Sequence, residues 1–422
     1  QEVHARQCDS CLWFGGLVIT TPLEGIRVVE MTSVVLGPYA CQMLGDLGAD
    51  IVKIEPLAGD TNRNLGPHAS DPKMSALFLT CNRNKRSVAL DLKSEAGREA
   101  ALKLIATADV VVHNFRPQAM ERLGLDYEKV KAVNASVVYC ATYGYSKKGP
   151  YGDKGALDDS IQAASGIAML QSMVAGEPRY LPTIIADKTT GLMVVQSVLA
   201  ALFHRERTGE GQAIEVPMFE SMVSFVMTEH LWGQSFVPPL DKAGYVRLMA
   251  SHRRPYKTAD GLYLAVLPYW DNHWGTFCAV AGKPELAEDP RFQTMALRLA
   301  NINESYRETG DIIASKTRQE WVDLLGNTNV PMMVVNTLDE LIDDPQLVEG
   351  GFWQEHDHPT EGRLRFSSPP MNFEKTPASI RRLPPGLGEH THELLSEVGY
   401  SPDQLAALQS EGAIQITKEN SQ

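Results

Sequence analysis

A strand–helix–strand pattern runs over residues 23–55, which read LEGIRVVEMTSVVLGPYACQMLGDLGADIVKIE. Residues 26–31 and 51–54 are short apolar runs of the kind that form buried strands. Between them, residues 39–47 carry apolar side chains at helical spacing, and Gly48 directly afterwards suits the end of a helix. The stretch therefore predicts a β–α–β unit.

The same alternation continues further along the chain. Residues 110–113 and 137–142 are apolar runs, and Ser94 can cap a helix that extends to Ala106. Strands this continuously apolar are usually covered by helices on both faces. We therefore predict an α/β fold whose large domain holds a Rossmann-like parallel sheet.

Charge and composition limit what the protein binds. The 422 residues hold 39 Lys plus Arg against 52 Asp plus Glu, and the net charge of −13 argues against a nucleic-acid partner. An apolar share of 43% with 22% charged residues is typical of a globular protein.

The longest nearly apolar stretch, residues 192–203, is shorter than the ~20 residues that cross a bilayer. Six cysteines are too sparse for a disulfide framework, so we expect a cytoplasmic protein that binds no membrane.

Changes in composition divide the chain into segments. Residues 1–21 lack helical or alternating periodicity and are predicted to be an unstructured extension. Cys8 and Cys11 within them lack the second pair that a zinc site needs, so we predict no metal site. The other predicted segments are a large domain over 22–232, a linker over 233–250, a smaller α+β domain over 251–329, and a return segment with the C-terminal part of the large domain over 330–422. Within them we expect a strand at 262–267 and helices at 270–281, 319–325 and 401–411, with a proline-rich, loop-rich stretch at 359–385.

Several common enzyme motifs are missing. The turn after the first predicted strand reads Leu36-Gly37-Pro38-Tyr39 instead of the G-x-G-x-x-G of dinucleotide-binding proteins. The sequence also lacks the P-loop pattern G-x-x-x-x-G-K-[ST] and the G-x-S-x-G of serine hydrolases. The absence of these motifs argues against a dinucleotide oxidoreductase, a P-loop NTPase or a serine hydrolase.

A set of short motifs, in order and at matching spacing over about residues 22–412, resembles the family III coenzyme A transferases. That family includes formyl-CoA transferase, carnitine CoA-transferase and α-methylacyl-CoA racemase. The motifs are LEGIRVVE (23–30), GP (37–38), LGDLGADIVKIE (44–55), NRNKRS (82–87), LDLK (90–93), NFRP (114–117), RLGL (122–125), HRERTGEGQ (204–212) and LGEHT (387–391).

The resemblance implies a CoA-transferase that moves coenzyme A from an acyl-CoA thioester to a free carboxylic acid through aspartyl anhydride and aspartyl-CoA intermediates. It places the catalytic nucleophile at Asp187, within IIADKTTG (184–191). The residues alone favour another role, because Asp187 is well placed as the N-cap of a predicted helix over 189–203. The two roles are compatible, since a helix N-terminus stabilises a carboxylate.

The resemblance also implies where coenzyme A binds, as part of the substrate and not as a tightly bound cofactor. The candidate residues are Val34 (through its backbone), Lys93, Asn114, Phe115, Arg116 and Arg122. Arginine suits phosphate because its planar fork donates two parallel hydrogen bonds. For Arg122 the alternative is that it only solvates a helix end, and we favour the phosphate-binding role. The basic cluster at residues 82–86 can bind substrate or face solvent.

Two alternative functions stay open. In the family's racemase, a His in a Gly-His-Asp motif, upstream of the residue equivalent to Asp187, supplies one of two acid/base groups. Leu157 stands at that position here and cannot transfer a proton. A non-catalytic CoA-binding protein would keep the arginines without needing Asp187. The adjacent Asp158 and Asp159 are interpreted as a turn, not as a catalytic pair.

Substrate specificity and assembly are expectations from the same resemblance. Val35 replaces a Gln that some family members carry, and no glycine-rich run lies between Gly233 and Gly261. The formyl or oxalyl specificity of those members therefore cannot be assumed for this chain. The more apolar wall suggests a dicarboxylic acyl group such as succinyl, whose distal carboxylate would meet an arginine within residues 247–254. Family members form two interlocked rings, so we expect an interlocked homodimer.

Overall fold

The computed structural model describes residues 20–417, so the predictions for residues 1–19, with Cys8 and Cys11, lie outside the described residues. Contacts divide the chain into two compact units. The first unit comprises the residues up to Gly155, Asp187–Met218 and the residues from Phe352 on; the second comprises Ala156–Ala186 and Phe219–Gly351. This grouping rests on contacts, and the domain limits expected from the sequence stay a prediction.

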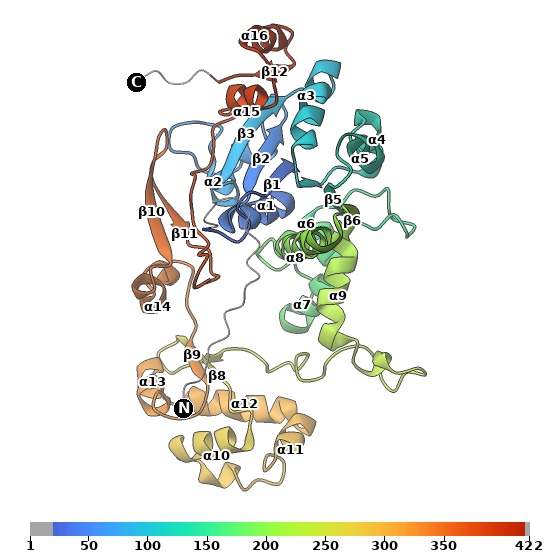
Figure 1. Cartoon of the computed structure of the whole chain (residues 1–422). Coiled ribbons are helices and arrows are strands. Elements are labelled where there is room, and N and C mark those ends of the chain that lie inside the picture. Colours follow the sequence, from blue (N-terminus) through green and yellow to red (C-terminus); the bar gives the residue numbers. More distant parts are fainter. Residues whose placement is uncertain (1–19, 418–422) are drawn as a thin grey trace, which may run out of the picture. The chain divides into compact units, whose positions relative to one another are not determined.

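A seven-stranded sheet forms the centre of the first unit (Figure 1). Its strand order is β12-β3-β2-β1-β4-β5-β6, and all neighbours are parallel except β12 and β3. The order 3-2-1-4-5-6 is that of the Rossmann fold, so the predicted parallel sheet is confirmed. The strands are β1 (Arg27–Met31), β2 (Asp50–Glu55), β3 (Lys85–Leu90), β4 (Val110–His113), β5 (Val138–Tyr143), β6 (Gln212–Pro217) and β12 (Ile414–Gln415).

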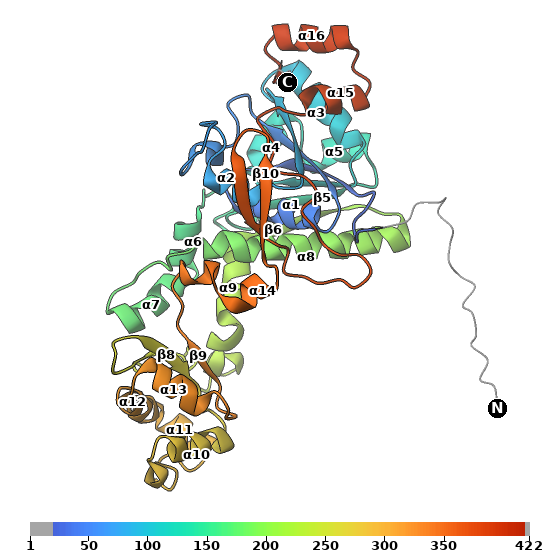
Figure 2. The ribbon, with the colours of Figure 1, turned by 90° about the vertical axis from the view of Figure 1, so that its left-hand side faces the viewer.

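Helices cover both faces of this sheet. The core on one face includes Val29, Val52 and Val111 from the strands and Leu104 from α3, while α1 packs on the opposite face (Figure 2). The Ser94 hydroxyl caps α3 by accepting from Gly97 N at 3.0 Å, as predicted. The helices of the first unit are α1 (Leu36–Asp46), η1 (Thr61–Asn64), α2 (Ala76–Cys81), α3 (Glu95–Ala106), α4 (Pro117–Leu123), α5 (Tyr127–Val133), α8 (Ile185–Thr208, whose first two residues belong to the second unit), α15 (Thr391–Glu397) and α16 (Pro402–Ser410).

The proline-rich segment is more ordered than expected at its start. It contributes to an antiparallel hairpin of β10 (Trp353–His358) and β11 (Gly362–Ser367). Beyond the hairpin, residues 368–390 contain neither helix nor strand, in agreement with the expected loop-rich return. The predicted helix near the C-terminus is confirmed as α16, which Ser401 caps through Gln404 N.

The basic cluster at residues 82–86 does not face solvent. All five residues are buried, and Lys85 and Arg86 open β3. Lys85 Nζ lies 2.8 Å from Glu30 Oε2, and Arg86 Nη2 lies 2.6 Å from Asp50 Oδ2. The basic cluster therefore has a structural role instead of facing solvent, because Lys85 and Arg86 neutralise carboxylates on β1 and β2.

A fully buried ion-pair network joins β1, β2 and β3. Lys53 Nζ lies 3.0 Å from Glu30 Oε1 and 3.0 Å from Asp60 Oδ2, with no side-chain exposure for Lys53 or Glu30. Burial alone would raise the pKa of Glu30, but Lys53 and Lys85 outweigh it and lower that pKa. This part of the core is therefore built from charged side chains. Each charge must stay paired, because an uncompensated charge in the interior is costly.

Helix α8 is the one helix in the described part of the chain that could cross a membrane by length and composition. Half of its apolar window is buried, and Val194, Val198 and Ala201 are among the buried residues. Partial burial of one face in this manner is typical of a core helix in a soluble protein.

The second unit contains a three-stranded antiparallel sheet with helices packed against it. Its core includes Trp274, Phe277, Trp321 and Leu264. The predicted strand at 262–267 and helices at 270–281 and 319–325 correspond to β8, α10 and α13. The elements are α6 (Asp158–Ala164), α7 (Ile167–Ala175), α9 (Met218–His230, whose first residue belongs to the first unit), η2 (Trp232–Ser235), β7 (Tyr256–Lys257), β8 (Tyr263–Val266), α10 (Asp271–Val280), η3 (Pro284–Leu286), α11 (Met295–Ala300), α12 (Ile302–Ile313), α13 (Arg318–Leu325), β9 (Met332–Val334), η4 (Glu340–Ile342) and α14 (Pro345–Glu349).

Candidate active site

The loop between β1 and α1 is held in an unusual conformation by buried polar groups. Val34 has a φ of +69°, which β-branched residues rarely adopt and which costs about 1–3 kcal/mol. Its N–H donates to Asp60 Oδ1 at 3.2 Å, and Asn62 Nδ2 donates to its carbonyl. Lys53 Nζ pairs with Asp60 and also donates to Thr32 O at 2.8 Å. The ion-pair network below the loop therefore fixes the backbone around Val34.

The loop after β4 is bonded directly to the β1–α1 loop. Asn114 Oδ1 accepts from Ser33 N at 3.2 Å, and Asn114 Nδ2 donates to Ser33 O at 2.9 Å. The order of the parallel strands reverses between β1 and β4, and α/β proteins bind ligands at the carboxyl ends of the strands there. The fold thus brings together four of the predicted residues, Val34, Asn114, Phe115 and Arg116, at this place.

Phe115 and Arg116 present side chains suited to coenzyme A. Phe115 is 37% exposed although it is apolar, and Arg116 is exposed with no ion pair among the described residues. Arg116 immediately precedes α4, and its Nη2 lies 2.3 Å from where a Cβ on Gly155 would be. Only a glycine at position 155 leaves room for the guanidinium in this position. An arginine and an aromatic ring side by side can take a phosphate and an adenine.

Lys93 and Arg122 are not joined to these loops by any hydrogen bond or ion pair within residues 20–417. Lys93 is exposed and follows β3, so it lies at the carboxyl edge of the same sheet. Arg122 is exposed in the last turn of α4, where a cation also suits the negative end of the helix. Their proposed contacts with coenzyme A remain predictions.

Asp187 lies inside the first turn of α8 and is 6% exposed. The helix begins at Ile185, four residues earlier than the predicted 189–203, so the expectation that Asp187 is the N-cap is wrong. The cap comes from Asp158, whose Oδ2 accepts from Ala186 N at 2.7 Å. The first turn still carries the positive end of the helix dipole, so the Asp187 carboxylate keeps that stabilisation.

The start of α8 packs against the start of α1. A Cβ at Gly191 would lie 3.0 Å from Leu36 O and 3.3 Å from the Tyr39 ring. Asp187 is four residues before Gly191, so both lie on the same side of α8. One turn is about 5.4 Å along the helix axis, and Asp187 therefore lies within about one turn of the contact with α1, close to the β1–α1 loop.

The adjacent aspartates do not form the expected turn. Asp158 and Asp159 are the first two residues of α6, and only Asp158 reaches the N-terminus of α8. Leu157, at the position of the racemase His, is 70% exposed, and its N–H donates to Ser160 Oγ at 2.9 Å. Position 157 therefore offers no proton-transfer group.

Sequence reasoning missed the residues that hold the β1–α1 loop in place. Lys53, Asp60 and Asn62 bond to Val34, Thr32 or one another, yet they belong to β2 and the segment after it. Each is an ordinary polar residue in the sequence. The one available signal was Lys53, a lone cation inside the otherwise apolar run of residues 51–54.

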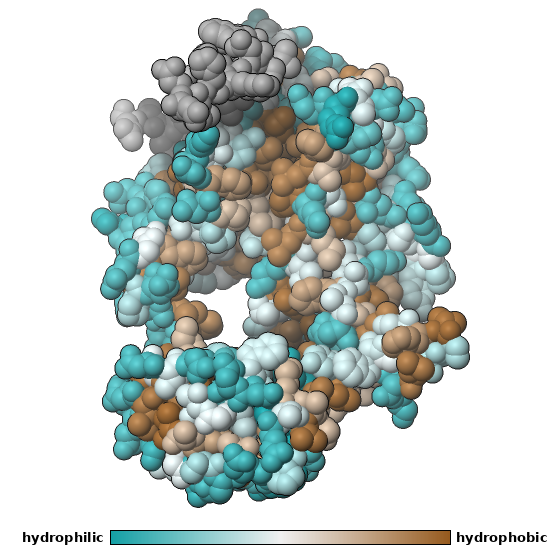
Figure 3. All heavy atoms as spheres, turned by 60° about the horizontal axis from the view of Figure 1, so that its bottom comes forward, coloured by the Kyte–Doolittle hydropathy of each residue, from teal (hydrophilic) through white to brown (hydrophobic). Residues whose placement is uncertain are grey.

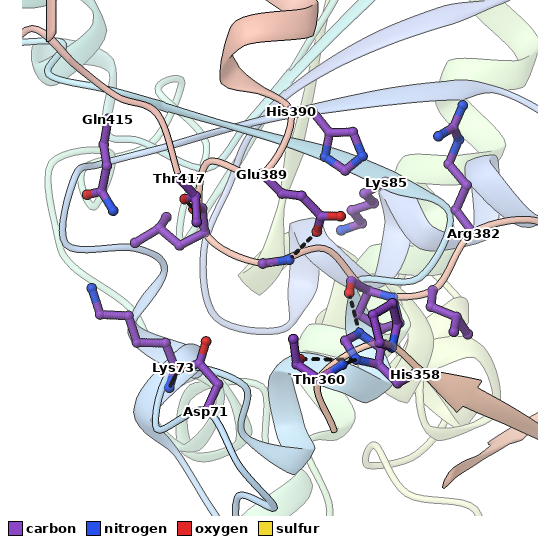
Figure 4. Close-up of a pocket in the computed structure, with 15 residues that line it drawn as sticks. Asp71, Lys73, Lys85, His358, Thr360, Arg382, Glu389, His390, Gln415 and Thr417 are labelled. Atoms are coloured by element: carbon purple, nitrogen blue, oxygen red, sulfur yellow. Dashed lines mark hydrogen bonds between the residues drawn. The ribbon is translucent and has the colours of Figure 1, made fainter. Parts of the chain in front are cut away.

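A separate cavity of about 890 Å³ lies in the first unit, where residues 382–390 run alongside β3 (Figure 4). Some of its polar groups are bonded to one another. Glu389 Oε2 accepts from Gly386 N at 2.7 Å, and His358 Nδ1 accepts from Thr360 N at 3.2 Å. None of the predicted site residues lines this cavity, so the candidate active site is at β1 and β4 instead.

No metal centre is evident in the described part of the chain, since no group of three His, Cys, Asp or Glu side chains there is placed to hold an ion. The candidate site offers the buried carboxylate of Asp187, the backbone around Val34 and the exposed guanidinium of Arg116.

Asn114→Ala should raise the KM for acyl-CoA about tenfold with little change in kcat. The variant loses both hydrogen bonds to Ser33, each worth ~0.5–1.5 kcal/mol, and so loosens the β1–α1 loop. Steady-state kinetics with varied acyl-CoA measure this. Asn372→Ala, on an exposed segment of the same unit, is the matched control and should leave KM unchanged; equal KM values in the two variants would contradict the role given to Asn114.

Comparison with known proteins gives concordant matches. Residues 23–391 match the family described as CoA-transferase family III. Succinyl-CoA:glutarate CoA-transferase of Mus musculus is 31% identical over 381 residues, covering 89% of this chain and 86% of that protein. Formyl-CoA:oxalate CoA-transferase of Escherichia coli is 30% identical over 424 residues, covering 94% of this chain and 100% of that protein. The crystal structure of a CAIB/BAIF family protein from Brucella suis superposes with a TM-score of 0.76 at 31% identity, covering 90% of this chain and 100% of that one.

Proposed function

Because the chain belongs to CoA-transferase family III, we propose that it moves coenzyme A from an acyl-CoA thioester to a free carboxylic acid with Asp187 as the nucleophile. The observation that carries this proposal is the place of Asp187, a buried carboxylate in the first turn of α8 beside the start of α1. The positive end of the helix favours the ionised, nucleophilic form.

The proposed reaction keeps the acyl groups activated at every step. An Asp187 oxygen attacks the thioester carbonyl carbon, the C–S bond breaks, and CoA leaves as a thiolate from a mixed anhydride. The thiolate attacks the aspartyl carbonyl and releases the donor acid, which leaves an aspartyl-CoA thioester. The acceptor carboxylate attacks this thioester to form a second anhydride and free the thiolate. The thiolate then attacks the acceptor's carbonyl, which yields the new acyl-CoA and restores Asp187.

Other residues of the first unit bind and orient the substrate in this proposal. The backbone around Val34 and the side chains of Asn114, Phe115 and Arg116 hold coenzyme A at the carboxyl ends of β1 and β4. Lys93 and Arg122 add positive charge for its phosphates. Water must be kept from the anhydrides, because hydrolysis would lose the activation.

We infer that the acids are dicarboxylic and of short chain. The mouse relative acts on succinyl-CoA and glutarate by its name, and the Escherichia coli relative on formyl-CoA and oxalate. Val35 is buried and apolar, which favours the larger pair. Incubating purified protein with paired donors and acceptors tests this choice: succinyl-CoA with glutarate should give glutaryl-CoA faster than formyl-CoA with oxalate gives oxalyl-CoA, and the reverse order would contradict it.

A 2-methylacyl-CoA incubated with the protein in deuterium oxide should keep its α-hydrogen. Racemisation needs an acid and a base on opposite faces of that carbon, and Leu157 supplies neither. Mass spectrometry of the recovered thioester measures exchange, with an added racemase of this family as the positive control. Rapid exchange would favour the racemase alternative over transfer.

We propose that two copies form the interlocked dimer that the family resemblance implies. Supporting it, apolar side chains reach the surface on the face drawn in Figure 3, and Val174, Val237 and Leu240 of the second unit are each more than 70% exposed. Exposed apolar patches are typical of protein–protein contacts.

Light scattering should therefore give twice the 46.4 kDa of one chain, with no change on dilution, because interlocked chains cannot separate without unfolding. A folded, active species with the mass of one chain would refute the dimer.

The cysteines support a reducing compartment. Cys41, Cys81, Cys140 and Cys278 are free and buried, as is usual for proteins of the cytoplasm. We propose a cytoplasmic location on this ground.

A further inference from the structure

We propose that a cavity inside the second unit binds the carboxylate of a short aliphatic acid, and that Arg247 is the cation that meets it. The cavity has a volume of about 240 Å³ and lies between α11, α12 and the segments that hold Arg247 and Tyr269. Its wall combines tyrosine rings with apolar side chains such as Leu299 and Ile302. The choice of a dicarboxylic acid as ligand rests on the proposed function, whereas the preference for a carboxylate rests on the cavity alone.

Two guanidinium groups line the cavity, and only one of them is neutralised. Arg298 is 4% exposed; its Nη2 lies 2.6 Å from Asp271 Oδ1 and donates to Tyr269 O at 2.8 Å. Arg247 pairs with no carboxylate among the described residues. Its Nε donates to Tyr245 Oη at 3.2 Å, and its guanidinium lies 5.3 Å and 4.9 Å from the ring centroids of Tyr245 and Tyr269. The cavity therefore carries one uncompensated positive charge.

The hydroxyl of Tyr306 is a second possible hydrogen-bond donor close to Arg247. This hydroxyl is buried and makes no hydrogen bond of good geometry among residues 20–417, although the side chains of Arg247 and Tyr269 are close enough to interact with it. Buried polar groups are nearly always bonded, so a phenol that lacks a well-formed hydrogen bond at the wall of a cavity can donate its O–H to a ligand that accepts it. The guanidinium of Arg247 can only donate hydrogen bonds, and the phenol of Tyr306 can donate one, so a single negatively charged group that only accepts would satisfy both.

A carboxylate with a short hydrocarbon tail fits this combination. Its two oxygens can accept from a guanidinium and a phenol together, and its methylene groups can pack on Leu299 and Ile302. The volume is below the ~300–1,000 Å³ of pockets that take drug-sized ligands, so the nucleotide part of coenzyme A is too large. An inorganic phosphate would meet the charge but would leave the apolar wall uncovered.

The test measures glutarate binding by ligand-detected NMR titration in a full-length chain that carries Asp187→Asn, so that no acyl transfer can occur. Glutarate should bind at one saturable site. Adding Arg247→Met should weaken binding at least tenfold, as expected for the loss of a charge-assisted hydrogen bond. Tyr306→Phe, which removes only the hydroxyl, should weaken it about three- to tenfold. Glutaramide, which has the same carbon chain without charge, should bind at least tenfold more weakly than glutarate.

Arg253→Met is the matched control, because Arg253 is exposed and does not line the cavity; it should leave glutarate binding unchanged. The proposal is overturned if Arg247→Met binds glutarate as tightly as its parent, if Arg253→Met weakens binding equally, or if inorganic phosphate displaces glutarate at a lower concentration than succinate does. The outcome is independent of catalysis. Loss of transfer with binding intact would contradict only the role of Asp187, and absent binding with transfer intact would contradict only the cavity.

Discussion

Asp187→Asn should lower the rate of CoA transfer by at least about 10⁴-fold while the chain folds normally. An amide cannot form the anhydride or the thioester, and removal of a covalent nucleophile typically costs ~10⁴–10⁶ in kcat. Folding should survive because Asn has the same shape and because Asp158, not Asp187, caps α8. Transfer is followed by chromatography of the acyl-CoA products, and folding by the thermal melt.

Asp159→Asn is the matched control for this substitution. Asp159 is a nearby exposed aspartate in the first turn of α6, and its replacement should keep most of the activity. The assignment of the nucleophile would be wrong if the Asp187 variant kept a tenth or more of the wild-type rate, or if the two variants lost activity equally.

Lys53→Met should lower the free energy of unfolding by about 3–5 kcal/mol, since removing one partner of a buried ion pair leaves the others uncompensated. Glu30 and Asp60 would both lose their 3.0 Å contacts with the ammonium group. Burial lowers the pKa of Lys53, but Glu30, Asp60 and Glu55 outweigh burial and raise it, so Lys53 is charged in the folded protein. Urea unfolding followed by circular dichroism measures the change.

Lys103→Met is the control for Lys53→Met. Lys103 makes an ion pair with Glu99 at 3.3 Å on the surface of α3, with both side chains at least 40% exposed. Surface pairs of this kind contribute only ~0.3–0.5 kcal/mol. If Lys53→Met destabilised the protein no more than Lys103→Met does, the buried network would not be what holds β1, β2 and the β1–α1 loop together.

The sheet could be predicted where its strands are apolar, and not where they carry charge. The runs at 26–31, 51–54, 110–113 and 137–142 correspond to β1, β2, β4 and β5, since such runs are stable only when buried. β3 starts with Lys85 and Arg86 and was therefore interpreted as a basic cluster. Its burial depends on carboxylates from β1 and β2, which are neighbours only because of the strand order, and no local pattern shows that order.

At the candidate site, too, the sequence indicated single residues but not the contacts between them. Family motifs indicated Val34, Asn114, Phe115 and Arg116 separately, but the bonds between Asn114 and Ser33 follow from the pairing of β1 with β4. The start of α8 was misplaced because its cap, Asp158, comes from 28 residues upstream of Ala186. An aspartate before a helical pattern looks like a cap in the sequence, and only the tertiary structure shows that another carboxylate takes that place.

The account depends most on Asp187 becoming covalently activated. The direct measurement is to incubate the protein with succinyl-CoA alone, trap it with hydroxylamine, and map the modified peptide by mass spectrometry. Activated acyl groups react with hydroxylamine, whereas a carboxylate with a purely structural role is never activated. The account predicts one donor-dependent hydroxamate at Asp187, and none in the Asp187→Asn variant. A hydroxamate at Asp158, Asp159 or a glutamate, or none at all in a protein that transfers CoA, would contradict it.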